Sequence, residues 1–153
     1  MTDIVLFLAS ILLGFLAGNR YFNKCRKRYV LYCDLERFAL YLSQNAKTKC
    51  QTIPSIYENI KGSFSQDFQE LYENCFVQNK ACQNLTLEER VEIDNFYIGI
   101  KQTSAHLVSN CADQYSGVFC SLKNKYNQIK STKGVAMQKL GVLCGVCFGL
   151  LII

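Results

Sequence analysis

Apolar positions gather at the two ends of the chain. From Ile4 to Gly18 every residue is apolar or small, and no residue from Leu140 to Ile153 is charged. A helix rises 1.5 Å per residue, so the first segment is about 22 Å long, against ~30 Å for the hydrocarbon core of a bilayer. Flanking aromatic and basic residues can extend each span into the interface. We therefore predict transmembrane helices over residues 1–19 and 134–153. The alternative for the second is a buried or interfacial helix.

Each apolar segment also carries small residues at a spacing of four, which places them on one helix face. These residues are Ser10, Gly14, Gly18, Gly141, Gly145 and Gly149. Small residues let two helix backbones approach closely in lipid, where no hydrophobic force drives association. The alternative is a general enrichment of glycine in membrane helices. We predict a packing face, formed either within one chain or between the chains of a homo-oligomer.

Between the two ends, apolar residues recur every three or four positions, which indicates α-helices. The pattern predicts helices over residues 29–47, 54–62 and 63–80, a fourth starting at Thr86, and a fifth from Thr103 or Ser104 to about residue 130. Ser63 and Thr86 each open a capping-box sequence, and Gly134 is a candidate joint to the last span. No segment alternates with a period of two. The predicted fold class is all-α, a small antiparallel helical bundle over residues 20–133 between two transmembrane helices.

The net charge of +5 comes from two basic blocks, one beside each apolar segment. The blocks are Arg20, Lys24, Arg26, Lys27 and Arg28, and Lys123, Lys125, Lys130, Lys133 and Lys139. A nucleic-acid binder would carry such charge on its folded domain, so we expect a lipid bilayer and no nucleic acid as partner. The positive-inside rule places both blocks in the cytoplasm and both termini outside.

Residues that could support catalysis are sparse. The single histidine, His106, has no nucleophile or carboxylate that the sequence holds beside it. The nine cysteines are odd in number and irregularly spaced. In a reducing cytoplasm they would act as small buried hydrophobic residues, as expected for Cys33, Cys75, Cys111 and Cys120. The lone pair Cys144 and Cys147 lacks the second pair that a metal site requires. We predict no enzyme activity, no metal and no cofactor.

Acidic residues cluster at the predicted starts of two helices. One cluster is Glu88, Glu89, Glu92 and Asp94, and the other is Asp67, Glu70 and Glu73. Carboxylates are favourable at a helix start because of the macrodipole, so a solvated helix start is the simplest interpretation. The first cluster is also our candidate contact for a basic partner surface, because exposed charges steer association.

The chain resembles the stage III sporulation protein AB family over nearly its full length. The resemblance lies in Leu12–Arg20, in Thr52-Ile53-Pro54 and above all in the stretch from Lys133 to Val146. It departs at residues 98–102, where Lys101 and Gln102 stand in place of the hydroxyl and Asp of the family.

The resemblance implies a subunit of the assembly that builds a secretion-like channel from the mother cell to the engulfed forespore. The family's cytoplasmic bundle is similar to the platform protein of type II secretion and type IV pilus systems. This implies docking of a cytoplasmic secretion-type ATPase, the stage III sporulation AA protein, and contact with other channel subunits. We expect a two-pass protein in the mother-cell membrane around the forespore. The alternatives are a membrane-tethered adaptor or signalling protein with no channel role, and a small membrane enzyme that uses cysteine thiols.

Overall fold

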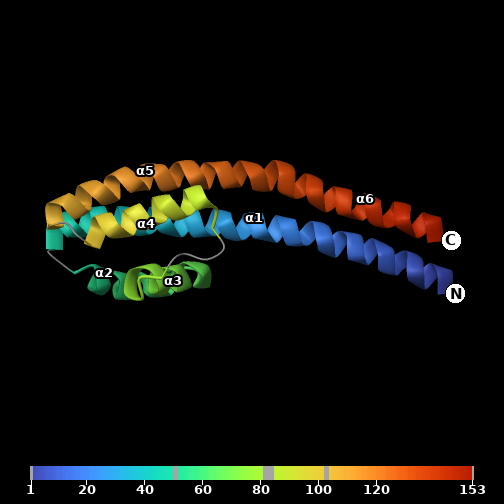
Figure 1. Cartoon of the computed structure of the whole chain (residues 1–153), viewed down its shortest axis with the longest axis horizontal. Helices are drawn as coiled ribbons and strands as arrows, with labels where there is room; N and C mark the ends of the chain where they lie inside the picture. Colours follow the sequence, from blue (N-terminus) through green and yellow to red (C-terminus); the bar gives the residue numbers. More distant parts are fainter. Residues whose placement is uncertain (1, 50–51, 81–84, 102–103, 153) are drawn as a thin grey trace. The chain divides into compact units, whose positions relative to one another are not determined.

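The computed structural model describes residues 2–49, 52–80, 85–101 and 104–152, and no strand occurs among them. The predicted all-α fold class is therefore confirmed for this part of the chain. The elements, shown in Figure 1, are α1 (Thr2–Lys49), α2 (Ile53–Ile60), α3 (Gln66–Tyr72), α4 (Leu87–Lys101), α5 (Ala105–Ile129) and α6 (Val135–Ile152). Short turns extend α2 and α3 as η1 (Lys61–Ser63) and η2 (Glu73–Val77). A π-helical turn, η3 (Lys130–Gly134), joins α5 to α6.

The chain divides into two compact units. Unit 1 contains Met1–Tyr29 and Lys123–Ile153, and unit 2 contains Val30–Leu122. The long helix α1 contributes to both, because it runs without a break from the first apolar segment into the central region. Residues 20–29 and 123–133, which carry most of the basic blocks, therefore belong with the apolar segments.

An aromatic cluster forms the centre of unit 2. Phe38 of α1 is fully buried, and its ring centroid lies between 5.6 and 6.4 Å from the centroids of five other rings. Those rings belong to Tyr57, Phe64, Phe68, Tyr72 and Phe96. Phe96 of α4 in turn meets Phe119 of α5 edge to face at 5.1 Å. Elements α1 to α5 are thus held together by aromatic side chains, whose large buried area dominates core energetics.

Helix starts in unit 2 follow local capping chemistry. At α4 the capping box forms in both directions. The Glu89 amide donates to Thr86 Oγ1 at 3.4 Å, and the Thr86 amide donates to Glu89 Oε2 at 2.9 Å. At α3 the cap is Ser65 and not the predicted Ser63, because the Ser65 hydroxyl accepts from the Phe68 amide. The Ser65 amide donates to the buried Asp34 of α1 at 3.0 Å, so a tertiary contact selects the start of the helix.

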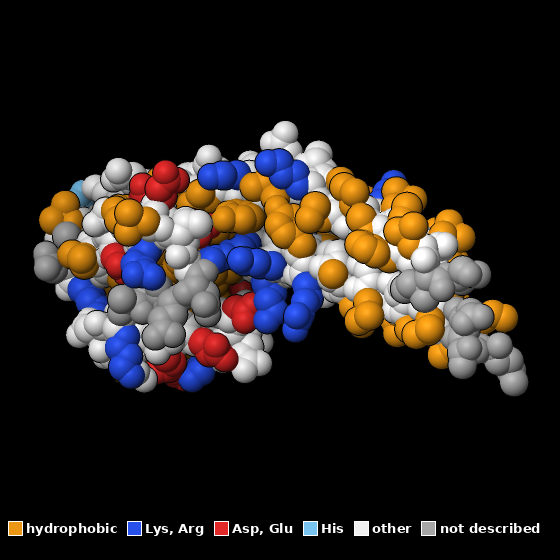
Figure 2. All heavy atoms as spheres, turned by 45° about the vertical axis from the view of Figure 1, so that its right-hand side comes forward, with side chains coloured by type: hydrophobic (Ala, Val, Ile, Leu, Met, Phe, Trp, Pro, Cys, Tyr) orange, Lys and Arg blue, Asp and Glu red, His pale blue; other side chains and the backbone are white. Residues whose placement is uncertain are grey.

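The terminal helices of unit 1 expose apolar side chains along their length. Leu8 is 60% exposed, Leu143 61% and Phe148 65%, and Figure 2 shows hydrophobic side chains spread over this part of the surface. Two helices, within Ile4–Ala46 and His106–Leu151, are long and apolar enough to cross a membrane by length and composition. Water-soluble proteins rarely expose large continuous apolar areas, so this surface needs a covering medium or partner.

The cysteines expected to be buried reduced thiols, Cys33, Cys75, Cys111 and Cys120, match that expectation only in part. Cys75 is buried, as expected, but it is disulfide-bonded instead of being a reduced thiol. Cys33, Cys111 and Cys120 are half-buried and form no disulfide, and Cys144 and Cys147 are exposed thiols. Disulfides are rare in a reducing cytoplasm, so the bond at Cys75 differs from the reduced thiol expected there.

Candidate functional site

The small residues of the two apolar segments all lie in one contact between α1 and α6 of the same chain (Figure 1). A Cβ at Gly145 would lie 2.7 Å from the Ser10 carbonyl oxygen and 2.8 Å from the Ile11 Cα. A Cβ at Gly18 would lie equally close to the backbone of Met137 and Gln138. Since real Cβ atoms do not approach backbone this closely, only glycine allows the two helices to come together here.

The other glycines continue the same contact. Gly14 and Gly141 face each other backbone to backbone, and Gly149 meets the Phe7 ring and the Ser10 hydroxyl. Ser10 Oγ lies 3.0 Å from the Gly145 carbonyl oxygen of α6 and 2.8 Å from the Phe7 carbonyl oxygen of its own helix, so its proton can be donated to either. Pairing within one chain, which the sequence left as one of two alternatives, is the arrangement that the structure adopts.

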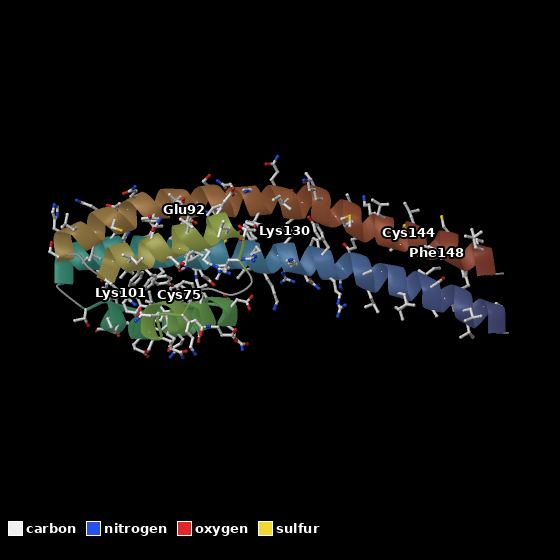
Figure 3. All side chains as sticks on the ribbon, viewed as in Figure 1. Cys75, Glu92, Lys101, Lys130, Cys144 and Phe148 are labelled. Carbon is white, nitrogen blue, oxygen red and sulfur yellow. The ribbon has the colours of Figure 1, made fainter. Side chains whose placement is uncertain are left out.

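Toward the basic blocks the contact changes from glycine to aromatic side chains. Phe22 of α1 lies over Gly134, where an added Cβ would stand 3.2 Å from its ring. Lys130 of η3 places its Nζ 4.3 Å from the centroid of the Tyr29 ring, a cation–π contact (labelled in Figure 3). The π-helical turn and the basic residues therefore adjoin the end of the glycine contact.

Only part of the acidic cluster on α4 is exposed. Glu88 is exposed, and Glu92 (labelled in Figure 3) and Asp94 are half-buried. Glu89 is 4% exposed and holds the Thr86 amide, so its carboxylate closes the helix start and is not available to a partner. This differs from the expectation that all four carboxylates form one contact.

Sequence reasoning missed a row of exposed apolar residues on the same helix. Leu87, Val91 and Ile98 are exposed by 78%, 49% and 52%. At 3.6 residues per turn they lie within about 40° of one another on the outward side of α4, with Glu88 and Glu92 to one side of them. The signal was present in the sequence as a second apolar stripe, but the inward stripe containing Phe96 masked it.

The second acidic cluster belongs to α3 and η2. Asp67 is half-buried in the first turn of α3, and Glu70 is exposed and accepts from Gln66 Nε2 at 3.0 Å. Glu73 begins η2. These carboxylates do not converge with one another on a shared ligand position, and across the described ranges no group of three or more His, Cys, Asp and Glu side chains could hold a metal ion.

Buried tyrosines are the most perturbed titratable groups of unit 2. Burial, followed by the charges of Glu73 and Glu58, raises the pKa of Tyr57 to about 12. Burial raises the pKa of Tyr72 and Tyr97 further, with smaller contributions from neighbouring phenols. The Tyr57 and Tyr72 rings stack with centroids 3.6 Å apart. These three phenols stay neutral at physiological pH, so they supply no phenolate base or nucleophile.

Lys101, the last residue of α4, makes two contacts with the segment that follows α3. Lys101 Nζ (labelled in Figure 3) donates to Asn79 Oδ1 at 2.5 Å and lies 4.8 Å from the centroid of the Phe76 ring. A Cβ at Gly99 would lie 2.7 Å from Cys111 Sγ. Gln102 lies outside the described residues. His106 is exposed near the start of α5.

Comparison with known proteins adds no relative: no family model matches the chain, and neither a curated protein nor a solved structure is significantly similar to it.

Proposed function

We propose that this chain is a non-enzymatic, two-pass membrane protein whose central region, residues 20–133, is a helical platform for assembly of a larger membrane machine. The observation that carries the proposal is the glycine contact between α1 and α6. Two apolar helices meet backbone to backbone at Gly14, Gly18, Gly141 and Gly145, while their remaining surface exposes Leu, Phe and Val side chains. This is the packing expected where lipid surrounds a helix pair.

The basic blocks support one orientation of the platform. Both lie at the same end of the helix pair, so the positive-inside rule places residues 20–133 in the cytoplasm and both chain ends across the membrane. The disulfide at Cys75 is the opposing observation. The ten basic residues beside the spans support the cytoplasmic orientation, because the positive-inside rule counts such residues.

The specific machine is proposed from the sequence resemblance alone. The chain would serve the secretion-like channel between mother cell and forespore during endospore formation, and would dock the stage III sporulation AA ATPase together with other channel subunits. The outward side of α4 suits such docking, because Leu87, Val91 and Ile98 form an apolar ridge beside Glu88 and Glu92. A groove lined by apolar residues and rimmed by Lys or Arg would accept this helix face.

The second candidate is a membrane-tethered adaptor with the same anchor and no channel role. Every structural observation above fits both candidates, which differ only in the partner that binds α4. Binding to the purified ATPase therefore separates the two candidates.

Charge reversal on α4 tests the docking face. Full-length protein in lipid nanodiscs would be titrated with the ATPase, for the wild type and for a Glu88→Lys/Glu92→Lys variant. Because exposed charges act mainly on association, we expect a slower association rate and a weaker salt dependence. The control Glu58→Lys/Glu70→Lys makes the same change in net charge on α2 and α3. It should leave the association rate and its salt dependence unchanged. Equal rates for the wild type and the α4 variant would remove this face from the proposal.

A further inference from the structure

Unit 1 carries a charge distribution that the glycine contact does not explain. It holds ten basic residues and a single acid, Asp3, which lies at the other end of the first apolar segment. We call the basic residues the basic collar: Arg20, Lys24, Arg26, Lys27, Arg28, Lys123, Lys125, Lys130, Lys133 and Lys139. Unit 2 has the opposite balance, with eleven acids and seven bases.

On α1 three of the five collar residues lie on the side away from the partner helix. Gly14 and Gly18 meet α6, and at 100° per residue Arg20, Lys24 and Lys27 lie about 120–180° around the helix from Gly18. All three are exposed. Arg20 and Lys24 therefore lie on the surface that meets the surroundings of the helix pair, close to where its apolar surface ends.

On α6 the contact with α1 fixes the height of Lys139. Gly18 meets the backbone of Met137 and Gln138, and Gly14 meets Gly141. Lys139 therefore lies at the same height as the part of α1 between Gly14 and Gly18. Its backbone thus lies inside the apolar band, and its side chain is exposed. A lysine in this position extends its methylene groups along apolar surface and places its ammonium at the phosphate layer.

We propose that the basic collar binds the headgroups of anionic phospholipids in the leaflet beside unit 2. The inference rests on the proposed membrane anchor. Basic residues next to a membrane span are attracted to anionic lipid, each by about a factor of five at low salt. The apolar surface directly beneath the collar identifies the partner as a lipid, since a soluble phosphate compound would leave that surface uncovered.

The absence of tryptophan makes lipid contact measurable. A Tyr21→Trp variant introduces a single fluorophore at the level of the collar, on a side chain that is 36% exposed. Full-length protein would be reconstituted in phosphatidylcholine vesicles that contain either brominated phosphatidylglycerol or brominated phosphatidylcholine. We expect phosphatidylglycerol to quench several-fold more strongly at equal content, and the difference to shrink at high salt because screening shortens the range of the charges.

Charge variants in the same background assign the effect to the collar. Arg20→Gln/Lys24→Gln should lose at least about half of the preference for phosphatidylglycerol. Arg20→Lys/Lys24→Arg keeps the charges and should retain the preference. Lys61→Gln/Lys80→Gln removes two charges from unit 2 and should also retain it.

Three results would overturn the inference. Equal quenching by the two brominated lipids would show that the collar does not select anionic headgroups. An undiminished preference in the Arg20→Gln/Lys24→Gln variant would assign the selection to other residues. Absence of quenching by either lipid would mean that the protein does not insert, which would overturn the membrane anchor and the collar together, whereas the first two results leave the anchor intact.

Discussion

Replacing Gly145 by leucine should separate α1 from α6. The first added carbon alone would lie 2.7 Å from the Ser10 carbonyl oxygen, about 0.7 Å short of the 3.4 Å at which ordinary contact begins. Both nearest atoms are α1 backbone, so no side chain can rotate away and the helices themselves must part. The rest of the leucine side chain pushes them toward the 8–10 Å axial distance of helices packed through larger residues.

The cost of this change has two parts. Overpacking a tight contact costs about 1–3 kcal/mol, and loss of the 3.0 Å hydrogen bond from Ser10 Oγ to the Gly145 carbonyl adds about 0.6–1.7 kcal/mol in a membrane. A total of about 2–5 kcal/mol shifts the equilibrium away from the paired state by a factor of roughly 30–4,000, at 1.4 kcal/mol per factor of ten.

Distances between spin labels on the two helices measure this separation. Labels at Leu6 of α1 and Leu150 of α6, both exposed, would be placed in a variant whose native cysteines are alanine. We expect Gly145→Leu to lengthen and broaden the distance distribution in nanodiscs. Leucine at the neighbouring exposed position 144 adds the same side chain on the outer surface and should change little. An unchanged distribution for Gly145→Leu would refute the glycine contact.

Three further predictions concern unit 2. Phe38→Ala removes the central ring of the aromatic cluster and should lower the free energy of unfolding by about 3–5 kcal/mol in chemical denaturation. The control Leu40→Ala, at a 43% exposed position, should lower it far less. Similar losses for both variants would contradict the assigned core. Thr86→Ala should cost about 1 kcal/mol by removing the α4 cap, measured in the same way against Thr52→Ala, whose side chain makes no capping hydrogen bond. Burial raises the pKa of Tyr57 to about 12, so above pH 10 the native state binds more protons than the unfolded state. The free energy of unfolding should therefore fall as pH rises from 10 through 12. A spectrophotometric titration in which all tyrosines of the folded protein ionise near pH 10 would contradict this burial.

Local patterns predicted the helices well where a short sequence carried the whole signal. The α4 capping box at Thr86 and Glu89 needs only residues within one turn, and it forms as its spacing indicates. The predicted start of α3 was wrong by two residues. Ser63 has the stronger local cap signal, with Gln66 three residues later, but the cap is Ser65, whose amide donates to Asp34, a residue distant in sequence. Capping also withdraws Glu89 from the surface, which a count of acids cannot reveal.

The sequence could not indicate which distant residues meet in the folded structure. The spacing of Ser10, Gly14 and Gly18 defines a face, but the same face can meet a helix of its own chain or of another. Likewise the apolar stripe of Leu87, Val91 and Ile98 is recognisable as exposed only once Phe96 is seen to face inward. The disulfide at Cys75 depends on which thiol lies nearby in space, and nine scattered cysteines leave the pairing undetermined.

The sidedness of the chain in a membrane is the most direct test of the account. A cysteine-free variant carrying Asn59→Cys, at an exposed position of α2, and a small tag at each chain end would be expressed in bacteria. We expect both tags to be accessible in intact cells. We expect a membrane-impermeant maleimide to label the cysteine at position 59 only after lysis. Full labelling of that cysteine in intact cells would place unit 2 outside, in agreement with the disulfide at Cys75, and would contradict a cytoplasmic platform.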